Sequence, residues 1–318
     1  MGYIGKVHLR NILNLKSAGL IAVSDTSEKA LANARKTGIR KTFTDSHKLL
    51  ADPDIDAVII ALPTYLHKDL ATEAAEAGKH ILLEKPLARN VEEGKEILSV
   101  TRKNGVKLMI GYDLRFSPPL LELKEKIQNG TLGEIEIAYA TNIGAGPFSH
   151  RAEGSIPRPV PSWWFNKELT GGGVLIDLGS HLINLTRWYF GEITDIKSYL
   201  GYRFNLDLED RATCVVKFAS GTVAVVNVGW FSFESQLKVD LMGTVKHASA
   251  SHIRQNQIVA GVQLLTTNSC RYYIPYFREL EYFVHCIRHD LQPQVSGDDA
   301  LNDLVAITRA YNNALPLT

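Results

Sequence analysis

The first third of the chain alternates between short apolar runs and longer helical patterns, and this alternation limits the possible fold more than any other feature. Residues 58–62 form a continuous apolar run, which is typical of a strand buried on both faces. Similar apolar runs occupy residues 20–24, 80–83 and 106–110. Helical patterns occupy residues 6–18, 27–36, 66–77 and 91–103. Strands alternating with helices in this way predict a parallel sheet of the α/β class.

The pattern changes after about residue 112 to a series of strands with few helices. The predicted strands are residues 135–141, 196–202, 212–218, 223–230 and 237–242. The predicted helices are residues 119–128, 174–189, 277–288 and 300–312. A chain of 318 residues also exceeds the ~250–300 residues of a single core. We therefore predict an α/β domain over residues 1–112 and an α+β domain with a large, mostly antiparallel sheet over residues 113–318.

Composition and charge exclude several classes of partner. The formal net charge is +1, which predicts no nucleic-acid partner. The apolar runs are too short to span a bilayer and the start of the chain lacks a signal-peptide core, so we predict no membrane partner and a cytoplasmic location. Cys214, Cys270 and Cys286 are odd in number and widely spaced, which argues against a disulfide framework. We predict no metal site, because no residue set has full ligand spacing.

The start of the chain fits part of a dinucleotide-binding fingerprint. Gly2 and Gly5 match the last two glycines of G-x-G-x-x-G, and a helix follows whose N-terminus would receive a pyrophosphate near Gly2, Tyr3 and Ile4. Asp25 ends the next predicted strand, where a carboxylate binds ribose hydroxyls and repels a 2′-phosphate, so NAD is favoured over NADP. The two glycines alone are equally compatible with a helix that merely begins near glycines.

The first strand of that fingerprint, and its first glycine, are missing from the sequence. Met1 would occupy the residue between the first two glycines of the motif. Because the first strand is central in a doubly wound sheet, its loss would remove both backbone pairing and core packing. We expect Met1 to be an internal start within a longer reading frame.

Four segments together resemble the family of glucose–fructose oxidoreductase, inositol dehydrogenase and rhizopine-catabolism proteins. They are residues 62–67, 77–87, 115–118 and 171–181, the second containing Glu84-Lys85-Pro86 and the last running from three glycines to His181. They occur in the family's order, and the resemblance extends from Gly2 to about Tyr311. It implies a Rossmann-type dinucleotide-binding domain followed by a substrate domain.

The resemblance also implies a catalytic set of Lys85, Asp177 and His181. Lys85 follows a buried strand, at the sheet edge where ligands bind in open α/β sheets. Asp177 and His181 are four residues apart, so both should lie on one helix face, where the carboxylate could orient the imidazole or hold substrate. From the residues alone, a solvated lysine at a strand end and a surface His–Asp pair are the alternatives.

By the same resemblance, further residues contact the cofactor and the substrate. The expected cofactor contacts are Gly2, Tyr3, Ile4, Asp25, Leu62, Pro63, Thr64, His67, Glu84 and Lys85, and the expected substrate contacts are Arg115, Trp164, Asp177 and His181. Phe165 and Asn184 depart from residues that are frequent in the family, so no single relative's substrate can be carried over.

The resulting hypothesis is an oxidoreductase that transfers a hydride between a nicotinamide cofactor and a secondary alcohol of a sugar, sugar nucleotide or cyclitol. The alternative is a non-catalytic sugar- or dinucleotide-binding protein of the same fold, which the incomplete fingerprint favours. The family resemblance further implies a homodimer or homotetramer formed through the second-domain sheet.

Overall fold

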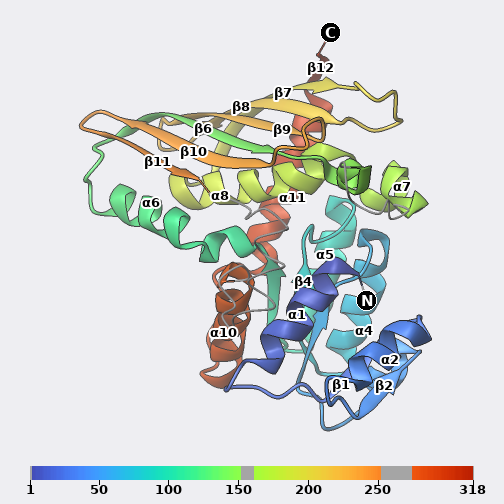
Figure 1. Ribbon diagram of the computed structural model, residues 1–318. Helices are drawn as coiled ribbons and strands as arrows, with labels where there is room; N and C mark the ends of the chain where they lie inside the picture. Colours follow the sequence, from blue (N-terminus) through green and yellow to red (C-terminus); the bar gives the residue numbers. More distant parts are fainter. Residues whose placement is uncertain (1, 152–160, 252–273, 318) are drawn as a thin grey trace.

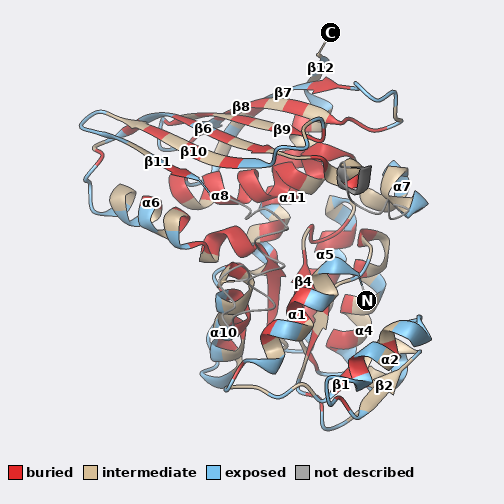
Figure 2. Ribbon diagram, viewed as in Figure 1, coloured by how far each residue is buried: buried red, intermediate tan, exposed pale blue. Residues whose placement is uncertain are grey.

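The computed structural model describes residues 2–151, 161–251 and 274–317, without the side chains of residues 149–151. A large sheet with helices beneath it lies above an α/β part, and the C-terminus lies at the top, beyond the sheet (Figure 1). Buried residues concentrate in the strands and in the helices that contact the large sheet (Figure 2). No helix in these ranges is long and apolar enough to cross a membrane.

The α/β part contains short parallel strands separated by helices, as the sequence predicts. The strands are β1 (Ala22–Ser24), β2 (Lys41–Phe43), β3 (Ala57–Ile60), β4 (His80–Glu84) and β5 (Leu108–Gly111). The helices are α1 (Tyr3–Leu13), α2 (Glu28–Arg35), α3 (Ser46–Leu50), α4 (His67–Glu76) and α5 (Val91–Lys103). Local signals set the helix starts: the Ser27 side chain accepts from the Ala30 amide at α2, and the Asn90 side chain accepts from the Glu93 amide at α5.

The parallel strands form two separate sheets rather than one. β1 pairs with β2, and β3, β4 and β5 pair in that order, but no described strand joins β1 to β3. The first described element is α1, which begins at Tyr3 and lies beside α10.

The large sheet has seven strands among the described residues, in the order β11-β10-β6-β9-β8-β7-β12. Their bounds are β6 (Ile135–Ile143), β7 (Ile193–Gly201), β8 (Arg211–Phe218), β9 (Val223–Gly229), β10 (Gln236–Gly243), β11 (His247–Ser251) and β12 (Ala314–Pro316). The β6–β9 and β7–β12 pairs are parallel and the other described pairs are antiparallel. The sheet is therefore mixed but mostly antiparallel, as predicted.

Helices cover one face of this sheet (Figure 1). The larger helices of this half are α6 (Pro118–Gln128), α8 (Ser180–Phe190), α10 (Ile274–Arg288) and α11 (Gly297–Asn312), and a short helix, α7, spans Lys167–Thr170. α10 packs against α1 and against the 3₁₀ turn η2 (Asp113–Phe116), so this late segment of the chain lies beside the α/β part (Figure 1). The proposed domain boundary at residue 112 separates the two halves in the sequence, but α10, which lies after it, packs against α1, which lies before it.

Candidate active site

Lys85 and Asp177 bring the two halves of the molecule together. Lys85 follows the last residue of β4, and its Nζ donates to Asp177 Oδ1 at 2.7 Å and to the Asp177 carbonyl oxygen at 3.0 Å. Their side chains are 17% and 26% exposed, so solvent reaches the pair only partly. The Lys85–Pro86 peptide bond is cis. The sequence prediction that these two residues share a site matches this contact.

Asp177 lies in a π-helical turn, η5 (Leu175–Gly179), that leads directly into α8. Its second carboxylate oxygen accepts from Trp230 Nε1 at 3.3 Å. Lys85 and the Trp230 indole therefore fix both oxygens of the carboxylate. Single π turns inside helices are rare and often occur at functional sites.

His181 lies in the first turn of α8 and faces a carboxylate that the sequence analysis missed. Its Nδ1 is 3.7 Å from Asp113 Oδ1, an ion pair when the imidazole is protonated, and both residues are buried. The Tyr112 ring meets the imidazole edge-on, with centroids 5.9 Å apart. The described contacts thus pair Asp177 with Lys85, and Asp113 with His181. Asp113 follows β5 at the ligand-binding edge of the sheet, a signal that could have identified it.

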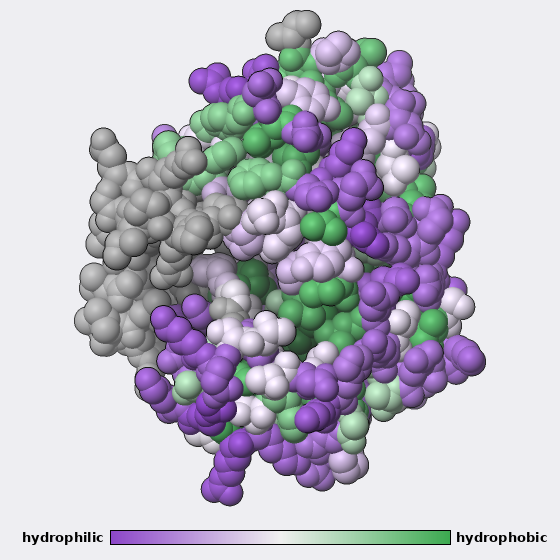
Figure 3. Space-filling model, turned by 90° about the vertical axis from the view of Figure 1, so that its right-hand side faces the viewer, coloured by the Kyte–Doolittle hydropathy of each residue, from purple (hydrophilic) through white to green (hydrophobic). Residues whose placement is uncertain are grey.

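Trp164 lies next to Trp230, whose indole contacts Asp177. It lies in η4 (Ser162–Phe165), and its ring centroid is 6.4 Å from that of Trp230, which donates to Asp177. Phe165 instead packs against Phe148, with centroids 6.0 Å apart. The molecular face shown in Figure 3 has a hollow near its middle with hydrophobic side chains beside it.

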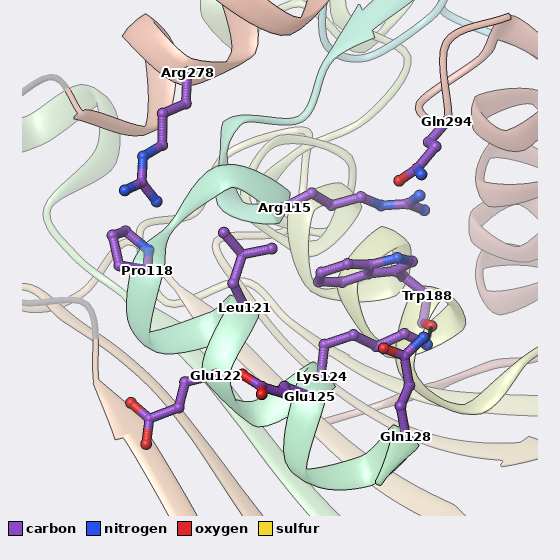
Figure 4. Close-up of a pocket in the computed structure, with 10 residues that line it drawn as sticks. All are labelled: Arg115, Pro118, Leu121, Glu122, Lys124, Glu125, Gln128, Trp188, Arg278 and Gln294. Carbon is purple, nitrogen blue, oxygen red and sulfur yellow. Dashed lines mark hydrogen bonds between the residues drawn. The ribbon is translucent and has the colours of Figure 1, made fainter.

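Arg115 and Asn184 lie in a buried polar network rather than beside Lys85. Arg115 Nε donates to Asn184 Oδ1 at 2.7 Å, and its guanidinium pairs with Asp299 at 2.5 Å. Arg115 also extends over the Trp188 ring at the wall of an open cavity of about 790 Å³ (Figure 4). The polar atoms of both residues are thus engaged within the protein, away from the Lys85–Asp177 contact.

His67 and Glu84, two of the expected cofactor contacts, hold elements together. His67 is buried, with Nδ1 2.9 Å from the Pro86 carbonyl oxygen and Nε2 2.9 Å from the Leu62 carbonyl oxygen. Burial lowers the pKa of His67 more than these carbonyls raise it. Glu84 Oε1 lies 2.6 Å from His8 Nε2 and so joins β4 to α1. These side chains fix the loop after β3 and the turn that carries Lys85.

The remaining expected cofactor contacts lie at helix and strand ends that fit a dinucleotide. Gly2 caps α1 without a side-chain bond, the first turn has no acidic residue, and Tyr3 is 62% exposed. The first amides of α1 can therefore bind an anion. Asp25 follows β1 and its carboxylate accepts from the Ser27 amide at 2.8 Å. The loop after β3 continues into η1 (Thr64–Leu66), and Leu62 in that loop is 42% exposed.

The other predictions concern cysteines and metals. Cys214 and Cys286 are buried free thiols, and Cys270 lies outside the described residues. Within the described ranges, no group of three or more His, Cys, Asp or Glu side chains is arranged to hold a metal ion.

Fold and site together define a two-domain oxidoreductase with a Rossmann domain. Residues 1–112 match the model of the oxidoreductase family with an NAD-binding Rossmann fold, and residues 120–248 match the GFO/IDH/MocA C-terminal domain. The chain belongs to the GFO/IDH/MocA oxidoreductase family, and its cofactor is NAD.

Curated relatives match over almost the whole chain. Myo-inositol 2-dehydrogenase of Thermotoga maritima is 28% identical over 315 residues, covering 94% of this chain and 90% of the relative. The scyllo-inositol 2-dehydrogenase (NAD(+)) of Bacillus subtilis is 29% identical over 337 residues, covering 100% of this chain and 94% of the relative.

Solved structures show the same fold. Levoglucosan dehydrogenase in complex with NADH and levoglucosan has a TM-score of 0.83 at 22% identity, covering 98% of this chain and 94% of that one. Scyllo-inositol dehydrogenase from Lactobacillus casei, with NAD(H) and scyllo-inositol bound, has a TM-score of 0.79 at 20% identity, covering 99% and 94%.

Proposed function

We propose that this protein is an NAD-dependent dehydrogenase for a secondary alcohol of a sugar or cyclitol, with Lys85, Asp177 and His181 as its catalytic residues. The observation that carries the proposal is the 2.7 Å contact between Lys85 and Asp177, one helical turn before His181. Lys85 contacts Asp177, and Asp113 lies 3.7 Å from His181, so each pair joins a residue that follows a strand of the α/β part to the segment around the start of α8. The names of the inositol and levoglucosan dehydrogenases support the substrate class.

NAD, when bound, would supply the acceptor for the hydride that leaves the carbon carrying the hydroxyl group. His181 takes the hydroxyl proton, because an imidazole exchanges protons near neutral pH. Asp113, 3.7 Å from the ring, stabilises the imidazolium that results. Lys85 donates a hydrogen bond to the same substrate oxygen, and Asp177 holds its ammonium group in place. In the reverse direction the same groups return the proton to a ketone.

For the cofactor, we propose that the first amides of α1, at Gly2, Tyr3 and Ile4, bind the pyrophosphate. Asp25 would bind the ribose hydroxyls. Leu62, Pro63 and Thr64 would contact the nicotinamide side, in a loop that His67 holds through the Leu62 carbonyl oxygen. Glu84 would hold β4, which carries Lys85, against α1. Substitution of Asp25 by Ala should weaken NAD binding, measured by calorimetry.

We further propose a homo-oligomer that forms through the uncovered face of the large sheet, in a cytoplasmic protein. Tyr139, Val225 and Val215 are register partners across β6, β9 and β8 on that face. Ile137 and Tyr139 are 41% and 42% exposed. An apolar sheet centre that the described helices leave uncovered is typical of an interface between copies. The free thiols of Cys214 and Cys286 agree with a reducing compartment.

The test is NADH formation with myo-inositol, scyllo-inositol and levoglucosan. Lys85→Ala and His181→Ala should each lower kcat by about 100- to 10,000-fold, the usual contribution of a positioned proton-transfer group. Lys95→Ala, at an exposed site on α5, is the control and should retain full activity. Normal turnover in both variants would exclude this catalytic set. No turnover by the unaltered protein with any polyol, together with measurable ligand binding, would favour a non-catalytic binding protein.

A further inference from the structure

The helix that carries Asp177 and His181 has an unusual N-terminal cap, supplied by a residue far along the chain. Glu209, just before β8, is buried at 3% exposure. Its Oε1 accepts from the Gly173 amide at 3.1 Å and the Leu175 amide at 2.9 Å. Its backbone carbonyl accepts from the Val174 amide at 3.0 Å. One residue thus satisfies three consecutive amides at the start of the helix, where such groups otherwise lack partners.

The three glycines before this helix make the close approach possible. A Cβ on Gly173 would lie 2.1 Å from the Glu209 carbonyl oxygen, and one on Gly172 would lie 2.2 Å from the Tyr311 hydroxyl. A Cβ on Gly171 would lie 2.5 Å from the carbonyl oxygen of Arg89. At Gly171 and Gly173 a side chain would therefore require movement of the neighbouring backbone, and at Gly172 it would displace the Tyr311 ring. The glycine segment is therefore held between Arg89 on the α/β side and Glu209 on the sheet side.

Tyr311 completes the anchor from α11. Its hydroxyl donates to Glu209 Oε1 at 2.8 Å. Burial raises the pKa of Tyr311 well above its usual value, with the charge of Glu209 as the next cause, so the hydroxyl keeps the proton that it donates. Burial also raises the pKa of Glu209, while the hydrogen bonds from Leu175 and Tyr311 oppose that shift.

A short path connects this anchor to the site. The Asp177 amide donates to the Gly173 carbonyl oxygen at 3.1 Å, and the Gly173 amide donates to Glu209. Arg89, which contacts Gly171, is four residues beyond Lys85. Displacement of the glycine segment would therefore move Asp177 relative to Lys85.

We propose that Glu209, with Tyr311, is a positioning residue that sets the place of Asp177 and, through it, of the Lys85 ammonium group. This inference rests on the proposed function of Lys85 and Asp177. Glu209 touches neither substrate nor cofactor in this role. Its contribution is the geometry of the π turn.

The first test compares Glu209→Ala with Glu209→Gln, which keeps the Oε1 acceptor. Glu209→Ala should lower kcat by about 100-fold, the loss expected from a displacement of roughly 1 Å at a reacting group, with KM for NAD unchanged. Glu209→Gln should recover most of the activity. Tyr311→Phe, which removes only the hydroxyl, should give a smaller loss of the same kind. Asp207→Ala, an exposed carboxylate two residues earlier, is the matched control and should behave as the unaltered protein.

A double-mutant cycle separates positioning from general stability. In an Asp177→Asn background, Glu209→Ala should cause little further loss of kcat, because the residue that it positions is already impaired. Fully additive losses, or a lower Tm with unchanged kcat, would overturn the inference and leave the proposed function intact.

Amide hydrogen exchange gives a readout that does not need activity. Glu209→Ala should speed exchange at Gly173 and Leu175 well beyond any change in the strands of the large sheet. Unchanged protection at these amides would overturn the anchor itself. If the unaltered protein showed no turnover, the proposed function would fail, and exchange would still decide whether Glu209 holds this turn.

Discussion

At the scale of single residues, Glu279 has a carboxyl group whose buried surroundings oppose its ionisation. It lies on α10 with 0% exposure, and neither side-chain oxygen has a hydrogen-bond partner among the described residues. Burial raises its pKa well above 4.5, with the charges of Glu84 and Asp113 as further causes. Glu279 therefore holds a proton in the folded protein at pH values where the unfolded chain has lost it.

This shift predicts how stability changes with pH. Because the folded-state pKa is raised, the contribution of Glu279 to folding is most favourable below the unfolded value of about 4.3 and is lost as pH rises toward the folded value. Glu279→Gln removes this titration. The variant should gain free energy of unfolding relative to the unaltered protein between about pH 5 and about pH 8, measured by urea denaturation. A constant difference across that range would show that Glu279 ionises normally.

The sequence predicts the proposed catalytic residues, but not the contacts that they make. Motifs predict Lys85, Asp177 and His181, and the structure brings Lys85 to Asp177. The spacing of four residues predicts Asp177 and His181 on one helix face, but it does not contain the π turn in which Asp177 lies. Nor does it contain Asp113, whose carboxylate lies 3.7 Å from His181. That contact depends on the packing of two distant segments, which no local pattern contains.

At the scale of elements, a buried ionic network joins α8 to α11. Arg187 on α8 donates to Asp303 at 2.7 Å, lies 3.3 Å from the Asp299 carboxylate, and reaches Glu192 at 2.6 Å. Asp303 is completely buried, and Asn184 also donates to it. Burial raises the pKa of Asp303, while the nearby guanidinium opposes that shift. Ion pairs between Arg187 on α8 and two aspartates on α11 therefore link the two helices beneath the sheet.

Arg187→Leu should therefore lower the free energy of unfolding by about 3–5 kcal/mol, the usual cost of leaving a buried partner charge uncompensated. The paired change Arg187→Leu with Asp303→Leu should restore much of the loss, because Asp299 keeps its contact with Arg115 and only the exposed Glu192 loses its partner. Urea denaturation of the single and double variants measures both. If the double variant were less stable than the single one, packing rather than charge pairing would dominate this contact.

Helices with clear periodicity were predicted closely, but very short elements were missed. The predicted helix over residues 91–103 matches α5 at both ends, because Asn90 caps it and apolar residues recur along one face. β2, β11, β12 and α3 were not predicted. β2 and β12 are three residues long, so neither carries a periodic signal, and pairing with β1 and β7 determines them.

At the scale of the whole molecule, the sequence predicted the fold class of each half. It could not predict that α10 leaves its own half and packs on α1, because that contact depends on the three-dimensional path of the chain. Nor could it show which face of the large sheet the described helices leave uncovered. The alternation of buried and exposed residues along the strands supplies that answer.

The open face leads to a prediction about assembly. Val225 lies at its centre, with Tyr139 and Val215 as its register partners on either side. Asp240 follows beyond Tyr139, and Lys197 beyond Val215, so an apolar centre has charged residues at its edges. This arrangement is that of an interface with a hydrophobic core and a polar rim.

Val225→Lys should therefore convert an oligomer into monomers, because it places an unpaired charge at the centre of an apolar contact. Sedimentation velocity would measure the change, with Leu291→Lys as a control, since Leu291 is 46% exposed and lies outside the sheet. Because the described helices that pack on this sheet lie against the opposite face, Val225→Lys should leave the Tm of the monomer near that of the Leu291 variant. An unchanged oligomer would mean that copies assemble through another surface, and a monomeric unaltered protein would mean that this apolar face is not used for self-association.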